Sequence, residues 1–197
     1  MTETDPSEPV DVPGQHHLGP TVERFDEQAD ALLERIRGNA AADRLFTFAS
    51  HVGDFSTIWH TTNIVLGIRE RDGRRVVAFA ALIGLESLLV NQGVKRLFRR
   101  ARPTAAGDSG LRVRQPSTSS FPSGHASAAT FAAILLIPRA GRTWAPAIAG
   151  AAAIVATSRA YVRIHHASDV VAGVVTGAVL VTAIKRAARR TGLRRYL

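Results

Sequence analysis

Three short polar clusters interrupt an otherwise apolar sequence, at residues 95–103, 121–125 and 158–169. Together they supply fixed cations, the histidines His125 and His165, a carboxylate and the start of a helix. Cations and free backbone amides stabilise phosphoryl oxygens, while histidines transfer protons or attack phosphorus. If the three clusters meet at one end of a helical bundle, they can bind and attack a phosphate.

The first cluster pairs two different cations. Lys95 and Arg102 are seven residues apart, so both lie on one face if a single helix runs through them, and Pro103 then ends that helix. A guanidinium offers a planar fork to two oxygens, whereas an ammonium is a compact point charge. A basic collar at a membrane boundary is the alternative, and the three arginines between them fit it. This cluster alone fits both interpretations equally.

The second cluster, Pro-Ser-Gly-His, has the composition of a helix start. Ser123 can cap the helix, and Gly124 lets a ligand approach the backbone closely. Free amides and the helix dipole favour an anion there, and His125 in the first turn can reach one of its oxygens. The alternative is an ordinary cap followed by a polar histidine.

The third cluster carries a histidine and a carboxylate at i and i+4. His165 and Asp169 share a face if a helix begins near His165, and a carboxylate on one ring nitrogen leaves the other as a nucleophile. Arg159 can cover a phosphoryl oxygen. Metal binding by His165, His166 and Asp169 is the alternative, but nearby cations repel a divalent ion and attract an anion.

In this order, the patterns Lys-x6-Arg-Pro, Pro-Ser-Gly-His and Ser-Arg-x5-His-x3-Asp resemble the type 2 phosphatidic acid phosphatase superfamily. That superfamily also includes bacterial acid phosphatases and vanadium haloperoxidases. Every motif position is matched between residues 95 and 169, whereas the flanking helices fit only in number and placement.

The resemblance implies a role for each matched residue. His165 would attack phosphorus to form a phosphohistidine, with Asp169 orienting it, and His125 would protonate the leaving oxygen and then activate water. The phosphoryl oxygens would be held by Lys95, Arg102, Ser123, Gly124 and Arg159. No metal or other cofactor is expected, because charge stabilisation and acid and base catalysis suffice.

The elements that must position these residues are predicted to be helices. Five apolar stretches rich in small residues lack strict alternation and exceed ordinary strand length, which predicts an all-α bundle. They run over residues 55–68, 76–94, 125–137, 144–157 and 170–184. A helix that crosses a bilayer needs about 20 apolar residues, and most of these stretches are shorter. Helix tilt and arginines at the helix ends can extend them.

Five spans would place twelve basic residues on the side of the C-terminus and nine on the opposite side. This weak bias predicts a cytoplasmic C-terminus, and an active site on the extracytoplasmic face of the cell membrane. A soluble helical domain is the alternative. The net charge of +9 does not indicate nucleic-acid binding, because the basic residues gather at helix ends rather than on one stripe.

The chain divides into four predicted parts. Residues 1–20 form a disordered acidic tail that is not a signal peptide, and residues 21–51 form an amphipathic helical segment. Residues 52–188 form the membrane-embedded bundle, and residues 189–197 form a basic tail. With no cysteine, thiol catalysis and disulfides are excluded.

A membrane lipid phosphatase is the member of the superfamily that the sequence favours. No secretion signal is expected, and the short segment between Pro103 and Pro122 leaves no room for a further domain over the site. A polyprenyl-linked phosphate or diphosphate is the expected substrate, with phospholipid phosphates next. The alternative is a catalytically silent protein that binds anionic lipid or acts as a membrane scaffold. The oligomeric state stays open.

Overall fold

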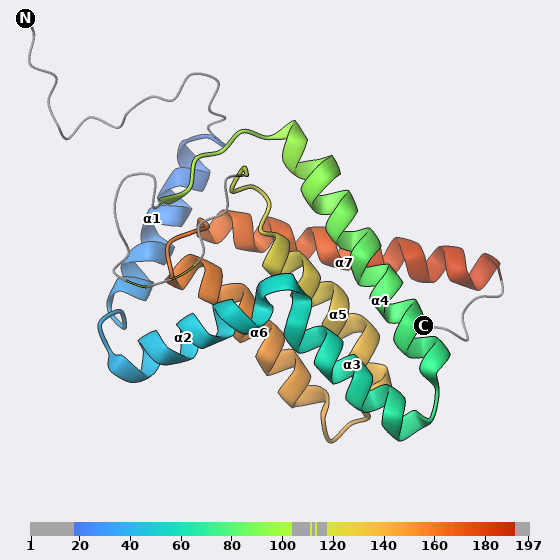
Figure 1. Cartoon of the computed structure of the whole chain (residues 1–197). Helices are drawn as coiled ribbons and strands as arrows, with labels where there is room; N and C mark the ends of the chain where they lie inside the picture. The colour runs from blue at the N-terminus through green and yellow to red at the C-terminus, as the bar shows by residue number, and fades with distance from the viewer. Residues whose placement is uncertain (1–17, 104–110, 112, 114–117, 192–197) are drawn as a thin grey trace, which may run out of the picture.

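The computed structural model describes residues 18–103, 111, 113 and 118–191, and within these ranges the chain is all-α (Figure 1). The described residues form seven α-helices: α1 Pro20–Glu34, α2 Ala40–Gly53, α3 Thr57–Glu70, α4 Gly73–Leu88, α5 Gly124–Ala140, α6 Ala145–Tyr161 and α7 Ala167–Arg190. The five predicted apolar helices are thereby confirmed as α3 to α7. The predicted N-terminal segment forms α1 and α2, with Asn39 capping α2.

Both predicted tails lie mainly outside the described residues. Pro20 already begins α1, and α7 continues to Arg190, so each predicted boundary differs by one or two residues. Helix ends commonly shift by this amount, because the terminal turn depends on capping contacts more than on composition.

The expectation of one continuous helix through Lys95 and Arg102 is wrong. After α4 the chain forms a π-helical segment, η2 (Leu89–Gly93), then a 3-10 turn, η3 (Val94–Leu97), and is extended from Phe98. Gly93 departs from helical geometry, with φ −95° and ψ −83°. The guanidinium of Arg102 then donates to backbone carbonyls, which stabilises the extended path in place of a helix.

Helix α5 occupies the centre of the bundle, with α3, α4, α6 and α7 packed around it. Ten of its 17 residues are buried, and most of these are alanines. A helix that is apolar on all sides has no face suited to water and is therefore expected in the interior. Phe131 and Leu136 of α5 lie in the main core beside Trp59 of α3 and Phe79 of α4.

Helices α5 and α7 approach each other closely at two glycines. A Cβ atom built on Gly173 would lie 2.4 Å from the carbonyl oxygen of Ser123, and one on Gly177 would lie 2.3 Å from that of Ser127. No side chain fits there. The Gly-x-x-x-Gly spacing therefore brings the start of α5 against the start of α7, and both starts carry predicted site residues.

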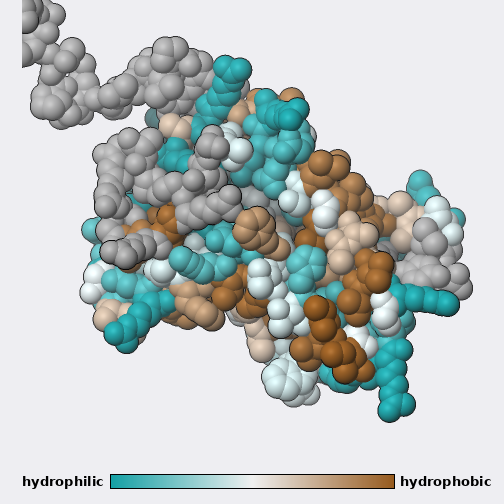
Figure 2. Space-filling model, in the orientation of Figure 1, coloured by the Kyte–Doolittle hydropathy of each residue, from teal (hydrophilic) through white to brown (hydrophobic). Residues whose placement is uncertain are grey.

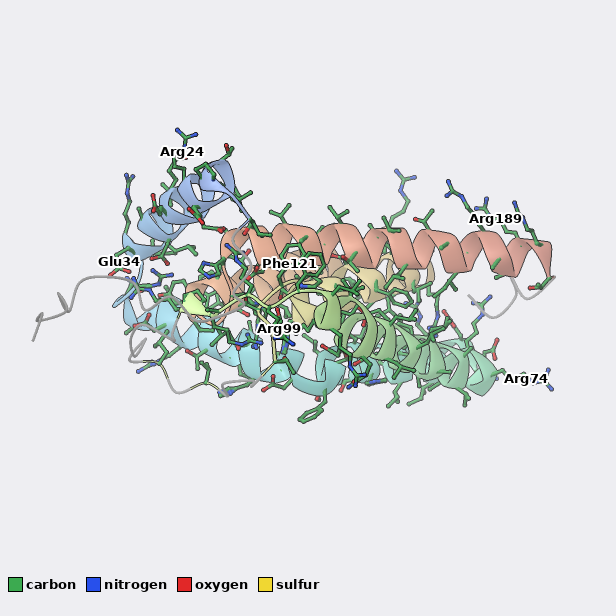
Figure 3. All side chains as sticks on the ribbon, turned by 90° about the horizontal axis from the view of Figure 1, so that it is seen from above. Arg24, Glu34, Arg74, Arg99, Phe121 and Arg189 are labelled. Atoms are coloured by element: carbon green, nitrogen blue, oxygen red, sulfur yellow. The ribbon has the colours of Figure 1, made fainter. Side chains whose placement is uncertain are left out.

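Two helices of the described chain are long and apolar enough to cross a membrane: Gly73–Leu97, with 25 residues, and Ala167–Arg190, with 24. Only 22% of the most apolar window of each is buried. Exposed hydrophobic side chains gather on α3, α4 and α7, and Figure 2 shows hydrophobic surface over α4. Charged side chains lie at the bundle ends, with Arg74 and Arg189 at one end and Glu34 toward the other (Figure 3).

Candidate active site

A cavity of about 270 Å³ opens where the ends of α2, α4 and α6, together with η2 and η3, meet the start of α5. Five of the eight predicted site residues line it: Lys95, Gly124, His125, Arg159 and His165. Positions up to 70 residues apart in the sequence thus share one cavity, as the three clusters predicted. Both histidines and two of the cations face the same space.

His165 lies in the turn between α6 and α7 and is 3% exposed. Its Nε2 atom is 3.3 Å from Nη1 of Arg102. Because a guanidinium can only donate, this contact requires the lone pair on Nε2 and the proton on Nδ1. Burial lowers the pKa of His165 to about 3, so the imidazole is neutral at physiological pH. Nε2 is therefore the ring nitrogen that carries the lone pair.

Asp169 is fully buried behind His165, but it is held mainly by other groups. Its Oδ2 atom lies 3.6 Å from Nδ1 of His165, which is an ion-pair distance and longer than a hydrogen bond. The amide of His166 donates to Oδ2 at 2.9 Å, and Nη1 of Arg100 donates to Oδ1 at 2.5 Å. Asp169 therefore lies on the Nδ1 side of His165 without making the expected hydrogen bond, and two further donors fix its position.

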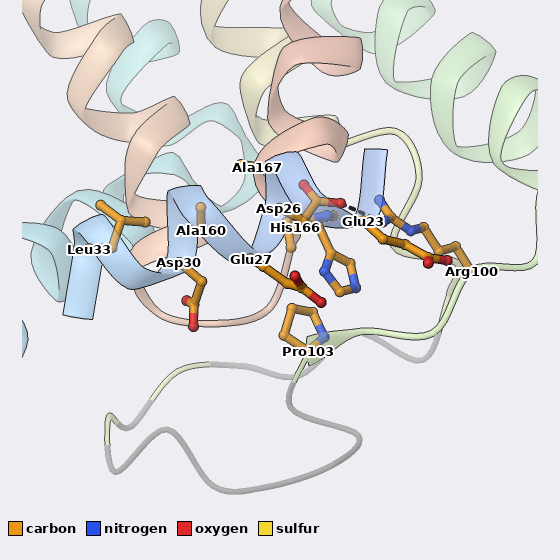
Figure 4. Close-up of a pocket in the computed structure, with 11 residues that line it drawn as sticks. Glu23, Asp26, Glu27, Asp30, Leu33, Arg100, Pro103, Ala160, His166 and Ala167 are labelled. Carbon is orange, nitrogen blue, oxygen red and sulfur yellow. Dashed lines mark hydrogen bonds and ion pairs between the residues drawn. The ribbon is translucent and has the colours of Figure 1, made fainter. Parts of the chain in front are cut away.

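Helix α1 completes the support of Asp169. Asp26, 7% exposed, accepts from Nη2 of Arg100 at 2.6 Å and from the amide and hydroxyl of Ser168, each at 2.7 Å. Figure 4 shows Asp26 and Arg100 in a second pocket of about 290 Å³, which also reaches His165 and is lined by acidic side chains of α1. A carboxylate of α1, a guanidinium and the carboxylate of α7 thus form one buried chain of charges.

Arg102 does not line the cavity that holds both histidines, but it contacts His165. Besides His165, its guanidinium donates to the carbonyl oxygens of Ile164 at 2.7 Å, Thr118 at 3.0 Å and Ser119 at 3.2 Å. Burial lowers the pKa of Arg102 to about 10, which still leaves it cationic at neutral pH. Its hydrogen bonds place a permanent positive charge beside Nε2 of His165.

The start of α5 lies beside Lys95. A Cβ atom on Gly124 would be 3.8 Å from Nζ of Lys95 and 3.3 Å from Oδ1 of Asn91, so the ammonium approaches the first backbone amides of the helix. Ser123 is fully buried, and its hydroxyl accepts from the amide of Ala126 at 3.4 Å, which confirms the predicted cap. Its side chain caps the helix and does not line the cavity.

Arg159, at the end of α6, is 2% exposed and donates from Nη1 to the hydroxyl of Ser50 on α2. Its Nε atom is buried, with no hydrogen-bond partner among the described residues. A buried donor without a partner is costly and is usually satisfied by a ligand or by water. Arg159 is therefore well suited to an anion in the cavity.

Two carboxylates in the cavity complete its polar lining. Asp54, at the junction of α2 and α3, accepts from Nε2 of His125 at 3.0 Å, 71 positions away in the sequence. The hydrogen bond with His125 holds the pKa of Asp54 below its usual value. Glu86 of α4 accepts from the hydroxyl of Ser127 on α5. Sequence reasoning missed Asp54, because no motif links it to His125.

The alternative of a metal site is not supported by the arrangement of these groups. In the described part of the chain, no three histidine or carboxylate side chains lie together as a metal-binding group. Nε2 of His166 is 3.3 Å from the carbonyl oxygen of Ala101, and Asp169 is occupied by Arg100. His166 and Asp169 thus each contact a protein partner.

Residues 75–192 match the PAP2 superfamily, and all three clusters fall inside this match. The chain belongs to the PAP2 superfamily. The resemblance seen in the sequence is thereby confirmed. Asp26, Ser50 and Asp54, which contact site residues of the PAP2 core, all precede the matched region.

Two PAP2 relatives are similar over most of their length. The chain is 36% identical over 127 residues to a decaprenylphosphoryl-5-phosphoribose phosphatase of Mycolicibacterium smegmatis, covering 63% of this chain and 67% of the relative. It is 35% identical over 151 residues to the protein of the same description from Mycobacterium tuberculosis, covering 76% and 80%. These relatives confirm the predicted class of enzyme, a lipid phosphatase.

The fold is shared with a solved PAP2 structure. A transmembrane PAP2-type phosphatidylglycerolphosphate phosphatase from Bacillus subtilis superposes with a TM-score of 0.68, covering 88% of this chain and 89% of that one. At 20% identity this similarity concerns the fold alone. The described chain also has two helices that are long and apolar enough to cross a membrane.

Proposed function

We propose that this protein hydrolyses a phosphomonoester on an isoprenoid-linked lipid, through a phosphohistidine on His165. The observation that carries the proposal is that His125 and His165 line one cavity together with Lys95 and Arg159. An acid and a nucleophile on either side of a cationic site suit in-line displacement at phosphorus.

The reaction then takes two steps. Nε2 of His165 attacks phosphorus and the bond to the leaving oxygen breaks, while His125 gives that oxygen a proton. Water next attacks the phosphorus, His125 takes a proton from it, and the P–N bond breaks to release phosphate and neutral His165. Lys95, Arg102 and Arg159 stabilise the negative charge on the equatorial oxygens in both transition states. Every proton is supplied and recovered by His125, so the cycle needs no cofactor.

The substrate is proposed to carry a sugar phosphate on a polyprenyl carrier. The relatives are described as decaprenylphosphoryl-5-phosphoribose phosphatases, and they align over most of this chain. The cavity also offers neutral polar side chains, Ser56, Ser87 and Asn91, beside the cations. Such groups suit the hydroxyls of a sugar better than the plain chain of a polyprenyl phosphate.

The proposed membrane arrangement has α3 to α7 as five spans, with the site on the extracytoplasmic face of the cell membrane. Two of these helices meet the length and hydropathy of a span, and basic residues slightly favour a cytoplasmic C-terminus. Helix α1 would lie along the outer surface, where its exposed Phe25 and Leu32, and Ile36 in the turn after it, can enter the headgroup region.

Phosphate release by the purified protein in detergent tests the proposal. Polyprenyl-linked sugar phosphate, polyprenyl phosphate, polyprenyl diphosphate, phosphatidic acid and phosphatidylglycerophosphate would be compared, each with EDTA and with vanadate. We expect the polyprenyl-linked sugar phosphate to be hydrolysed fastest. Hydrolysis should persist in EDTA and should be inhibited by vanadate. Release from phospholipid phosphates alone would overturn the isoprenoid assignment, and no release from any of the five would favour a silent lipid-binding or scaffold protein.

A further inference from the structure

Asp54 brings a negative charge into a cavity that has to bind an anion. Its carboxylate lies beside the first turn of α5, where it accepts from Nε2 of His125 at 3.0 Å. Both side chains are partly accessible, 29% for Asp54 and 20% for His125, so the pair faces the cavity. A carboxylate here repels a phosphate, and its presence calls for a compensating role.

The local backbone is built to bring Asp54 to this imidazole. Phe55 and Ser56 follow it with φ values of 53° and 58°, in the left-handed region that non-glycine residues rarely occupy. Thr57 donates from Oγ1 to the carbonyl oxygen of Asp54 at 2.8 Å, which secures the turn. Gly53 is needed for the approach, because a Cβ atom there would lie 2.8 Å from Cδ2 of His125. Strain of this kind persists where the surrounding structure enforces it, commonly at functional sites.

The charges around His125 make such a partner useful. Lys95, Arg159 and the neutral ring of His165 face it across the cavity, and Glu86 of α4 also lines this space. Two of these neighbours are fixed cations, which disfavour the positive charge that a general acid must carry before it gives up a proton. Asp54 is hydrogen-bonded to His125, and its negative charge opposes this repulsion.

We infer that Asp54 is the positioning residue of His125. It accepts a hydrogen bond from Nε2–H, stabilises the imidazolium, and leaves the proton on Nδ1 to be transferred. As the bond from phosphorus to the leaving oxygen breaks, that proton moves from Nδ1 to the oxygen, and Asp54 stays ionised. In the second step Nδ1 takes a proton from the attacking water. The inference rests on the proposed function, since it assigns a partner to the proposed acid.

Single-turnover release of the leaving group from the full-length protein tests this inference. For Asp54→Asn we expect the single-turnover rate on the lipid substrate to fall about 10- to 100-fold. The KM from steady-state kinetics should change less than about twofold. On p-nitrophenyl phosphate, whose leaving group needs no proton, the same variant should lose less than about threefold. The double variant Asp54→Asn/His125→Ala should release the leaving group no more slowly than His125→Ala alone. Asp54→Glu, which keeps the carboxylate, should be faster than Asp54→Asn.

Thr57→Val is the matched control, because it removes a hydrogen bond of the same turn and leaves the carboxylate in place. We expect it to keep the wild-type dependence on the leaving group. A wild-type rate for Asp54→Asn on the lipid would overturn the inference. So would equal losses of rate on the lipid and on p-nitrophenyl phosphate, if the losses of the two single variants also multiply in the double variant. If instead His125→Ala itself keeps the wild-type rate, the proposed function loses its acid, and that failure is separate.

Discussion

Arg100 and Asp169 form a buried ion pair, with Nη1 and Oδ1 2.5 Å apart and side chains only 7% and 0% exposed. The second terminal nitrogen of the same guanidinium reaches Asp26 of α1 at 2.6 Å. Each carboxylate is thus neutralised by a cation that they share. The orientation of the carboxylate behind the proposed nucleophile therefore depends on a helix at the start of the chain.

Replacing Arg100 by leucine should destabilise the protein strongly. The change leaves Asp26 and Asp169 buried without their cation, and removing one partner of a buried pair typically costs about 3–5 kcal/mol. Thermal unfolding in detergent measures the loss. Arg24→Leu, at an exposed position of α1, is the control and should change the unfolding temperature little. Equal unfolding temperatures for the two variants would contradict this role of Arg100.

Gly173→Ala should lower activity at least about tenfold without preventing membrane insertion. The new methyl group meets the carbonyl oxygen of Ser123 at 2.4 Å, so α5 and α7 must separate, which typically costs about 1–3 kcal/mol. That separation moves His125 relative to His165. Gly150→Ala on α6 is the matched control, because nothing lies within 4 Å of its added atom. The prediction fails if both variants release phosphate at the same rate.

His165→Asn should reduce phosphate release by at least about 10³-fold while the bundle stays folded, since it removes the proposed nucleophile from a preformed site. Brief incubation of wild-type protein with labelled substrate should trap protein-bound phosphate that is stable in base and labile in acid. The variant should trap none. Labelling that persists in His165→Asn would assign the covalent step to another residue.

The stability of the protein should fall as the pH drops below about 6.5, in part through His165. An unfolded histidine takes up a proton near pH 6.5, whereas burial keeps the folded ring neutral down to a pKa of about 3. Between these values the unfolded state binds more protons, so acid favours unfolding, and above about 6.5 the effect is absent. The unfolding temperature of His165→Asn should therefore depend less on pH between 6.5 and 5 than that of wild type. Parallel curves would show that His165 does not titrate this way.

The sequence predicted the helices and the meeting of the three clusters well, because both depend on local patterns. Apolar stretches of small residues identify α3 to α7, and motif spacing identifies the residues around His165. The course of the chain around Arg102 was predicted wrongly, because contacts with distant carbonyl groups decide it. Asp26 and Asp54 were missed for the same reason, since each meets its partner across more than 70 positions.

The contacts of Asp26, Ser50 and Asp54 matter for hybrid proteins made by joining parts of this enzyme and its relatives. Each of the three precedes residue 75, and each is bonded to an arginine or histidine that follows it. A hybrid joined near that position would combine supporting and reacting groups from different parents. Such hybrids should lose turnover even when both parents are active, so exchanges meant to alter substrate range should carry residues 20–56 along with the motifs.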